Sequence, residues 1–243
     1  MQLPRPFGER GGVRGNRCEE NTPMPYRTIL FDLDGTLVDT ALDLAHALNL
    51  LRSRRGLPAL DDAITRPQAS HGSQGLLRVG FGVTHEQAGF ASLRAEFLAT
   101  YETHLTAHST LFPGVAEMLD ALDTRGMKWG VVTNKPARYT EPLLAHLGLL
   151  ARAACVVSGD TCAQPKPHPA PMLRACELTA SDPMECLYVG DAERDVVAAA
   201  AVGIPTLVAL YGYLGADDRP ETWGAHGFID APLALLDWLQ PGA

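Results

Sequence analysis

The chain has 243 residues, a formal net charge of −8 and 46% hydrophobic side chains. A chain of this length can bury a large core, and 20% charged residues without low-complexity runs exclude extensive disorder. The acidic balance argues against a general binder of nucleic acid or anionic membranes, although a small anionic substrate stays compatible with it. We therefore expect neither nucleic-acid nor membrane partners.

The cysteines and the N-terminal residues favour a cytoplasmic location. The five cysteines form no CxxC pair, which argues against a disulfide framework or a structural zinc site and favours a reducing compartment. The first 20 residues lack the apolar segment of a secretory signal. Residues Val196–Ala216 are uncharged, but Gly203 and Pro205 interrupt them, so we interpret this stretch as helix, turn and buried strand.

The N-terminal part of the chain predicts a disordered extension, one strand and a long helical segment. Residues 1–25 are rich in Gly, Arg and Pro and have little hydrophobic periodicity, and Met1 and Met24 are both candidate starts. Thr28–Phe31 is a short apolar run, which is typical of a buried strand. Residues 40–108 show helical spacing of apolar side chains, most regularly over Ala88–Leu105.

Beyond residue 108 the pattern alternates between strands and helices. Strands are predicted at Lys128–Val132, Ala154–Val157, Leu187–Val189, Thr206–Leu210 and Gly227–Ile229. Helices are predicted at Gly114–Asp123, Arg138–Leu147, Pro169–Glu177, Glu193–Val202 and Leu233–Leu239. This alternation predicts an α/β fold with a Rossmann-like parallel sheet and helices on both faces. Residues 26–39 and 109–243 would form this core, and residues 40–108 would be a helical insertion after the first strand.

Polar residues follow several predicted strands, where open α/β sheets bind their ligands. They are Asp32 and Asp34 after the first strand, Thr133 and Asn134 after Lys128–Val132, and Asp191 with Asp195 after Leu187–Val189. Lys166 lies in a proline-rich loop near the same edge. Gathered carboxylates repel one another unless a cation binds them, and oxygen ligands favour Mg²⁺. With Lys166 and the Thr and Asn donors, they describe a pocket for a phosphoryl group.

Two neighbouring carboxylates can also supply the chemistry of phosphate-ester hydrolysis. One carboxylate can attack phosphorus and form an aspartyl-phosphate. The other can protonate the leaving alcohol and then deprotonate the water that hydrolyses the intermediate.

Four motifs resemble those of the haloacid dehalogenase superfamily phosphatases. In order along the chain they are Asp32–Thr40, Val131–Lys135, Lys166–Pro169 and Gly190–Asp195. The resemblance covers residue 26 to the end. It implies that residues 40–108 are a cap that closes over the substrate and excludes water.

The resemblance also implies individual roles. Asp32 would be the nucleophile and a Mg²⁺ ligand, and Asp34 the general acid and base, with its backbone carbonyl on the metal. Thr133 and Asn134 would hold the transferring phosphoryl group, and Lys166 would contact that group and Asp32. Asp191 would bind Mg²⁺, and Asp195 would support the metal site directly or through water. Asp39 is expected to cap the first helix of the insertion, and Lys135 to be peripheral.

The resemblance separates some subgroups and leaves others open. Dehalogenases of this fold lack the carboxylate found here at Asp34, and related phosphonate hydrolases need a cap lysine, which residues 40–108 do not contain. Arg66–Gly82 resembles the phosphoglycolate phosphatase group, which we favour. Tyr211–Tyr213 and Trp223 resemble a branch acting on N-acetylmuramic acid 6-phosphate, although both stretches are also compatible with ordinary packing. A β-phosphoglucomutase-like phosphotransferase stays open, and a non-enzymatic binding protein is disfavoured.

The partner expected from these motifs is a small phosphorylated metabolite. The chain itself would act as a monomer or homodimer.

Overall fold

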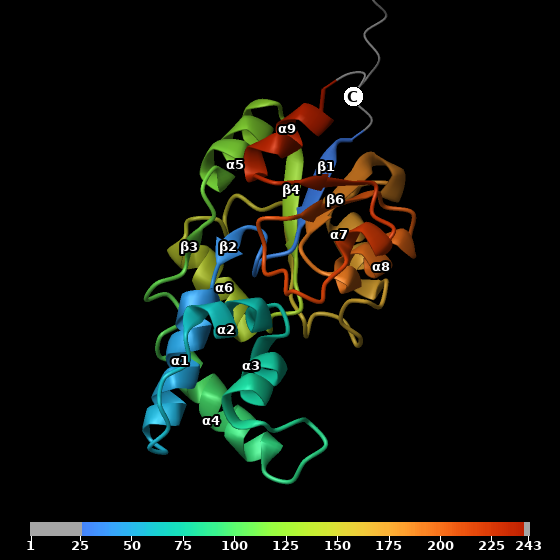
Figure 1. Ribbon diagram of the computed structural model, residues 1–243. Coiled ribbons are helices and arrows are strands. Elements are labelled where there is room, and N and C mark those ends of the chain that lie inside the picture. Colours follow the sequence, from blue (N-terminus) through green and yellow to red (C-terminus); the bar gives the residue numbers. More distant parts are fainter. Residues whose placement is uncertain (1–25, 241–243) are drawn as a thin grey trace, which may run out of the picture.

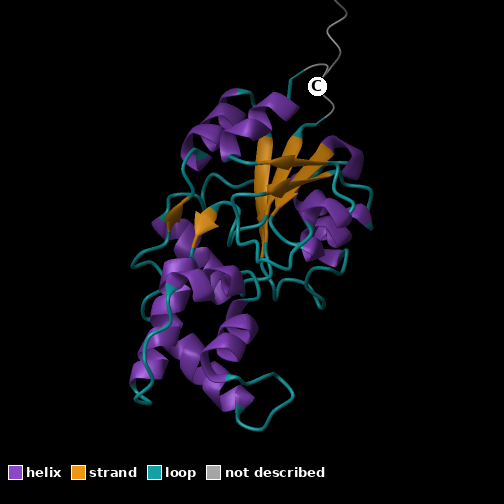
Figure 2. Cartoon of the chain, in the orientation of Figure 1, coloured by secondary structure: helices purple, strands orange, loops and turns teal. Residues whose placement is uncertain are grey.

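The computed structural model describes residues 26–240, so the predicted N-terminal extension lies outside the described residues. A parallel sheet of six strands forms the centre of the upper part of Figures 1 and 2, with strand order β5-β4-β1-β6-β7-β8. The strands are β1 (Thr28–Phe31), β4 (Lys128–Val132), β5 (Cys155–Val157), β6 (Cys186–Gly190), β7 (Thr206–Ala209) and β8 (Gly227–Ile229). The α/β fold and its parallel sheet are therefore as predicted.

Helices cover both faces of the sheet because side chains of each strand alternate between the faces. Ile29 and Phe31 of β1 pack in one buried cluster with α5, α6 and α9, whereas Leu30 packs in a second cluster with α7 and α8. The bounds are α5 (Val115–Thr124), α6 (Ala137–His146), α7 (Ala170–Thr179), α8 (Glu193–Ala200) and α9 (Leu235–Trp238). Short 3₁₀ helices lie at Pro183–Glu185, Pro220–Thr222 and Pro232–Ala234.

Four helices form the lower part of Figure 1 and lie between two short strands. They are α1 (Ala41–Ser53), α2 (Asp62–Ala69), α3 (Gly72–Phe81) and α4 (Phe90–Glu102). The two strands, β2 (Val38–Asp39) and β3 (Thr110–Leu111), pair antiparallel and so bring the entry and exit of this helical segment together. Assigning residues 40–108 to a separate cap domain stays a prediction.

A buried carboxylate on α1 holds the chain segment that leads from α4 back to β3. Asp43 on α1 is fully buried, and its carboxylate accepts hydrogen bonds from the backbone N–H and hydroxyl of Ser109 and from the backbone N–H of His108. A buried carboxylate with this many donors fixes the chain where the helical segment returns to the sheet. No helix among residues 26–240 is long and apolar enough to cross a membrane.

Candidate active site

The register of the sheet brings the ends of its central strands to one edge. Phe31 at the end of β1 is paired with Val131 of β4 and with Val189 of β6, so the residues after these strands lie close together. One carboxylate oxygen from each of Asp32, Asp191 and Asp195 lies within 4.8 Å of the other two, and all three residues are buried. The sheet edge that the sequence predicted as a ligand site therefore carries a cluster of three buried carboxylates.

A buried lysine balances part of this negative charge. Lys166 Nζ lies 3.1 Å from Asp32 Oδ1 and 2.6 Å from Asp195 Oδ1. The ammonium group also donates to the carbonyl oxygen of Val132 at 2.7 Å and to the hydroxyl of Tyr188 at 2.8 Å. The lysine side chain is completely inaccessible, and these partners compensate for its loss of hydration.

Asp195 is occupied by partners within the protein. Its Oδ1 faces Lys166, and its Oδ2 accepts the backbone N–H of Ala192 at 3.1 Å, at the N-terminus of α8. Burial raises the pKa of Asp195, and the neighbouring Lys166 opposes this effect. Asp195 is therefore directly paired with Lys166.

Asp191 carries a buried carboxylate oxygen that is available to a ligand. Its Oδ2 accepts the backbone N–H of Tyr213 at 2.9 Å, whereas its Oδ1 is buried and has no hydrogen-bond partner among residues 26–240. Burial and then the charge of Asp32 raise the pKa of Asp191 to about 8. An unpartnered buried oxygen beside further carboxylates is a suitable environment for a hard divalent cation. The residues present fit Mg²⁺.

Glycines allow two loops to close around Asp191. Gly35 has a φ of +85°, and a Cβ at that position would collide with the Asp191 carboxylate. A Cβ on Gly212 would lie 2.6 Å from the carbonyl oxygen of Gly35 and against Asp191 Cβ. The loops after β1 and β7 can approach this carboxylate only because both residues lack side chains.

Asp34 lies at the mouth of the cluster and has two polar partners. The hydroxyl of Thr40 donates to Asp34 Oδ1 at 2.6 Å, and Lys135 Nζ lies 3.0 Å from the same oxygen. Lys135 also donates to the hydroxyl of Tyr101 on α4 at 2.7 Å, and its side chain is 6% exposed. The expectation that Lys135 is peripheral was wrong, because the helical segment folds back and encloses this side chain between α4 and Asp34.

The side chain of Asn134 is directed to the Lys166 loop. Its Nδ2 donates to the Lys166 carbonyl oxygen at 2.8 Å, and its Oδ1 accepts the Lys166 backbone N–H at 2.9 Å. Asn134 therefore holds the backbone that carries the buried lysine. Thr133 is buried beside it, and its Oγ1 accepts the Lys135 backbone N–H at 3.2 Å.

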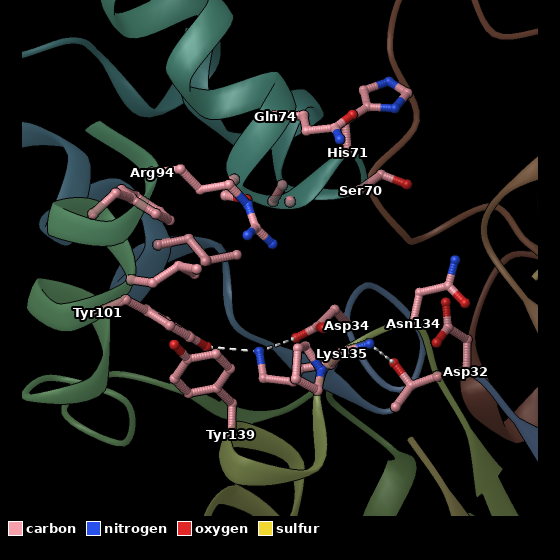
Figure 3. A pocket seen from close by; sticks show the side chains of 18 of the residues that line it. Asp32, Asp34, Ser70, His71, Gln74, Arg94, Tyr101, Asn134, Lys135 and Tyr139 are labelled. Atoms are coloured by element: carbon pink, nitrogen blue, oxygen red, sulfur yellow. Dashed lines mark hydrogen bonds and ion pairs between the residues drawn. The ribbon is translucent and has the colours of Figure 1, made fainter. Parts of the chain in front are cut away.

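A pocket of about 400 Å³ lies between this edge and the helical segment. Asp32, Asp34 and Asn134 line the sheet side, and Ser70, His71 and Gln74 the helical side, as Figure 3 shows. Ser70 and Ser73 belong to the stretch Arg66–Gly82 that was singled out in the sequence, and both line the pocket.

Arg194 is a pocket residue that sequence reasoning missed. Its Nη2 lies 3.9 Å from Asp32 Oδ2 and donates to Ser70 Oγ at 3.4 Å. Burial lowers the pKa of Arg194, but Asp195, Asp32 and Asp191 outweigh it and raise the pKa above its ordinary value. The sequence did offer one indication of this role, because Arg194 lies within the fourth motif, directly before Asp195 on α8.

The base of α1 is tied to the acidic cluster through Tyr213. The Tyr213 hydroxyl accepts the backbone N–H groups of Thr40 at 2.6 Å and Ala41 at 3.0 Å, and donates to Asp39 Oδ1 at 2.9 Å. Thr40 occupies the N-cap position of α1, but its side chain forms no capping bond. The expected capping contact comes from Asp39, whose Oδ1 accepts the backbone N–H of Ala41 at 3.4 Å. Asp39 also pairs with Arg66 of α2 at 2.9 Å.

Fold and site together define the class of protein: an α/β enzyme with an acidic, lysine-bearing site at the carboxyl ends of its parallel strands, under a helical segment. The chain belongs to the haloacid dehalogenase-like hydrolases, whose family model matches residues 29–209. Within this family the chain is a phosphoric monoester hydrolase, as the following relatives indicate.

Curated relatives match nearly the whole length of both chains. An N-acetylmuramic acid 6-phosphate phosphatase of Pseudomonas putida is 41% identical over 212 residues, which is 87% of this chain and 95% of that protein. A phosphoglycolate phosphatase of Xanthomonas campestris is 43% identical over 218 residues, covering 88% and 98%. The crystal structure of a predicted phosphoglycolate phosphatase from Haemophilus somnus has a TM-score of 0.78 at 28% identity, covering 89% of this chain and 99% of that one. The family and the enzyme class expected from the motifs are confirmed.

Proposed function

We propose that the chain hydrolyses a small phosphomonoester through an aspartyl-phosphate on Asp32. The observation that carries this proposal is the position of the Asp32 carboxylate, which faces the pocket while its Oδ1 lies 3.1 Å from the ammonium of Lys166. A carboxylate fixed beside a cation can receive an anionic phosphoryl group, because the cation offsets the repulsion between the two.

The reaction proceeds in two displacements at phosphorus. An Asp32 oxygen forms a bond to phosphorus while the bond to the ester oxygen breaks, and Asp34 gives its proton to the departing alcohol. Asp34 then takes a proton from water, whose oxygen attacks phosphorus and releases Asp32 and inorganic phosphate. Arg194 and Thr133 line the pocket and offer positive charge and a hydroxyl to the phosphoryl oxygens, and Lys166 adds positive charge from behind Asp32.

Asp32, Asp191 and the backbone carbonyl of Asp34 are the proposed ligands of Mg²⁺. When bound, Mg²⁺ neutralises charge on the phosphoryl oxygens and orients them. We assign Asp195 to holding Lys166 in place, because both of its oxygens already have partners. Asn134 likewise acts as a positioning residue for the Lys166 loop.

The substrate is proposed to be of the phosphoglycolate type, as the Xanthomonas relative's name suggests. The size of the pocket favours a second candidate, N-acetylmuramic acid 6-phosphate, which the Pseudomonas relative's name contains. A two-carbon acid phosphate fills only part of about 400 Å³, whereas pockets of this size enclose sugar-sized ligands. A panel of kcat/KM values for both compounds and other sugar phosphates ranks the candidates. A clear preference for nucleotides or diphosphates would contradict both.

The chemistry is tested separately with Asp32→Asn. We expect Mg²⁺-dependent hydrolysis of p-nitrophenyl phosphate to fall by about 10³-fold or more, because the amide is a poor nucleophile. Asp120→Asn is the matched control, since Asp120 is an exposed partner of Arg152 remote from the pocket. Retained activity in Asp32→Asn would exclude the aspartyl-phosphate route.

A cytoplasmic location and a monomeric or homodimeric state stay predictions.

A further inference from the structure

The pocket contains four cationic or basic side chains, and two of them face the catalytic carboxylates. Lys135 is paired with Asp34, and Arg194 faces Asp32. The third is His71, whose pKa is lowered by burial and then by the charge of Arg194, which favours the neutral imidazole. The fourth is Arg94 on α4, on the helical side of the pocket.

Arg94 is held in place without being neutralised. Its Nε donates to Ser73 Oγ on α3 at 3.0 Å, and it forms no ion pair with any carboxylate among residues 26–240. In Figure 3 the guanidinium points into the cavity, on the opposite side from Asp32. Its two terminal nitrogens are therefore directed at the space that a substrate would occupy.

We propose that Arg94 and Ser73 form an anion subsite that binds a carboxylate of the substrate while its phosphoryl group reacts at Asp32. This inference rests on the proposed function and narrows it to phosphomonoesters that also carry a carboxylate. The planar pair of nitrogens matches a carboxylate in a two-point contact. A second phosphate, with its higher charge, would be expected to face several cations, whereas this wall offers one.

The pocket between the two charged ends suits a carbon skeleton. Phe97, Leu98 and Tyr101 of α4, together with Tyr139 of α6, add apolar surface to the pocket lining. Apolar walls with polar groups at each end orient a ligand in one direction, so that only one of its two anionic groups reaches Asp32. The subsite would thus determine both affinity and orientation.

Two pairs of substrates, in each of which one member carries the carboxylate, test this proposal. Phosphoglycolate is compared with ethyl phosphate, and N-acetylmuramic acid 6-phosphate with N-acetylglucosamine 6-phosphate, which lacks the lactyl ether that bears the carboxylate. In Arg94→Gln we expect the KM of the carboxylated member to rise by about 10- to 100-fold, because a charge-assisted contact is lost. The kcat/KM of the carboxylate-free member should change by less than about twofold. Arg94→Lys should restore part of the affinity, since it keeps the charge.

Arg78→Gln is the matched control, because Arg78 lies on α3 of the same helical segment, bonds to Gln68 at 3.0 Å and lines a different cavity. Arg94 is itself exposed, so its substitution should leave the fold intact. An equal loss for both members of a pair, or no loss for either, would overturn the subsite. So would an Arg94 dependence confined to sugar bisphosphates.

Failure of the subsite is distinguishable from failure of the proposed function. Wild-type protein that hydrolyses no phosphomonoester, p-nitrophenyl phosphate included, would contradict the function. Calorimetric binding of the same four compounds to wild type and Arg94→Gln still measures the carboxylate contact without turnover. Equal binding of carboxylated and carboxylate-free compounds by wild type would overturn the subsite on its own.

Discussion

Lys135 Nζ lies 3.0 Å from Asp34 Oδ1, so the proposed acid and base is paired with a lysine that the helical segment buries. The same ammonium donates to Tyr101 on α4, which makes it a bridge between the helical segment and the catalytic carboxylate. The Asp34 carboxylate pulls the pKa of Lys135 upward against the effect of burial. Lys135 therefore keeps its positive charge while it holds the Asp34 carboxyl group in place.

Lys135→Met tests the importance of this pair. We expect kcat to fall by about 10- to 100-fold, because Asp34 loses the group that orients it for proton transfer. Unfolding free energy should fall by about 1–3 kcal/mol, since Tyr101 Oη loses its hydrogen-bond partner. Steady-state kinetics and denaturant unfolding measure both effects. Lys128→Met is the control, because Lys128 lies at the exposed start of β4 and its ammonium group donates to the Thr179 carbonyl oxygen, away from the pocket. An unchanged kcat would show that Lys135 has no such role.

The sequence predicted the sheet edge well because strand ends and motifs coincide. Asp32 and Asp191 directly follow apolar strands, and parallel pairing fixes their proximity once the strands are recognised. Lys135 and Arg194 could not be assigned in this way, because their partners are set by how the helical segment folds back. Whether Asp195 contacts Lys166 or a metal ion likewise depends on the direction of its side chain. The i, i+4 spacing of Asp191 and Asp195 does not determine that direction.

Mg²⁺ should stabilise the protein more at high pH than at low pH. The pKa of Asp191 is about 8 without the metal, compared with an ordinary 3.8, because burial and Asp32 disfavour its charge. The folded, metal-free protein therefore retains a proton that the unfolded chain releases. The stabilisation from this proton is complete below pH 3.8 and is lost as the pH rises to about 8. Above that pH, Mg²⁺ has no proton to displace.

The measurement is the shift of Tm between excess Mg²⁺ and EDTA. We expect the shift to grow by several degrees between about pH 6 and pH 8.5. In Asp191→Asn the shift should be small at both values, because the neutral amide neither titrates there nor binds the cation well. A wild-type shift that is equal at the two pH values would rule out competition between proton and Mg²⁺ at Asp191.

Tyr213→Phe should weaken the base of the helical segment. The hydroxyl accepts two backbone N–H groups at the start of α1, and losing an N-terminal cap of this kind costs about 1–2 kcal/mol. Thermal unfolding and KM for the carboxylated substrates are the readouts. Tyr211→Phe is the matched control. Tyr211 lies in the same loop after β7, and its hydroxyl donates a hydrogen bond to the backbone carbonyl oxygen of Thr36 at 3.1 Å. Equal effects of the two substitutions would argue against a specific role of Tyr213.

Gly212→Ala should impair the metal site without touching a charged group. The added Cβ would lie 2.6 Å from the Gly35 carbonyl oxygen and against Asp191 Cβ, so the two loops must separate. We expect the Mg²⁺ concentration for half-maximal activity to rise about tenfold, since Asp191 is displaced from its supporting contacts. Gly215→Ala in the same loop is the control, because its nearest neighbour, Asp218 Oδ2, would lie 3.3 Å away at the end of a side chain that can move. Excess Mg²⁺ should restore much of the activity of Gly212→Ala. An unchanged Mg²⁺ dependence together with lower kcat would show instead that this close packing serves the catalytic carboxylates and not the cation.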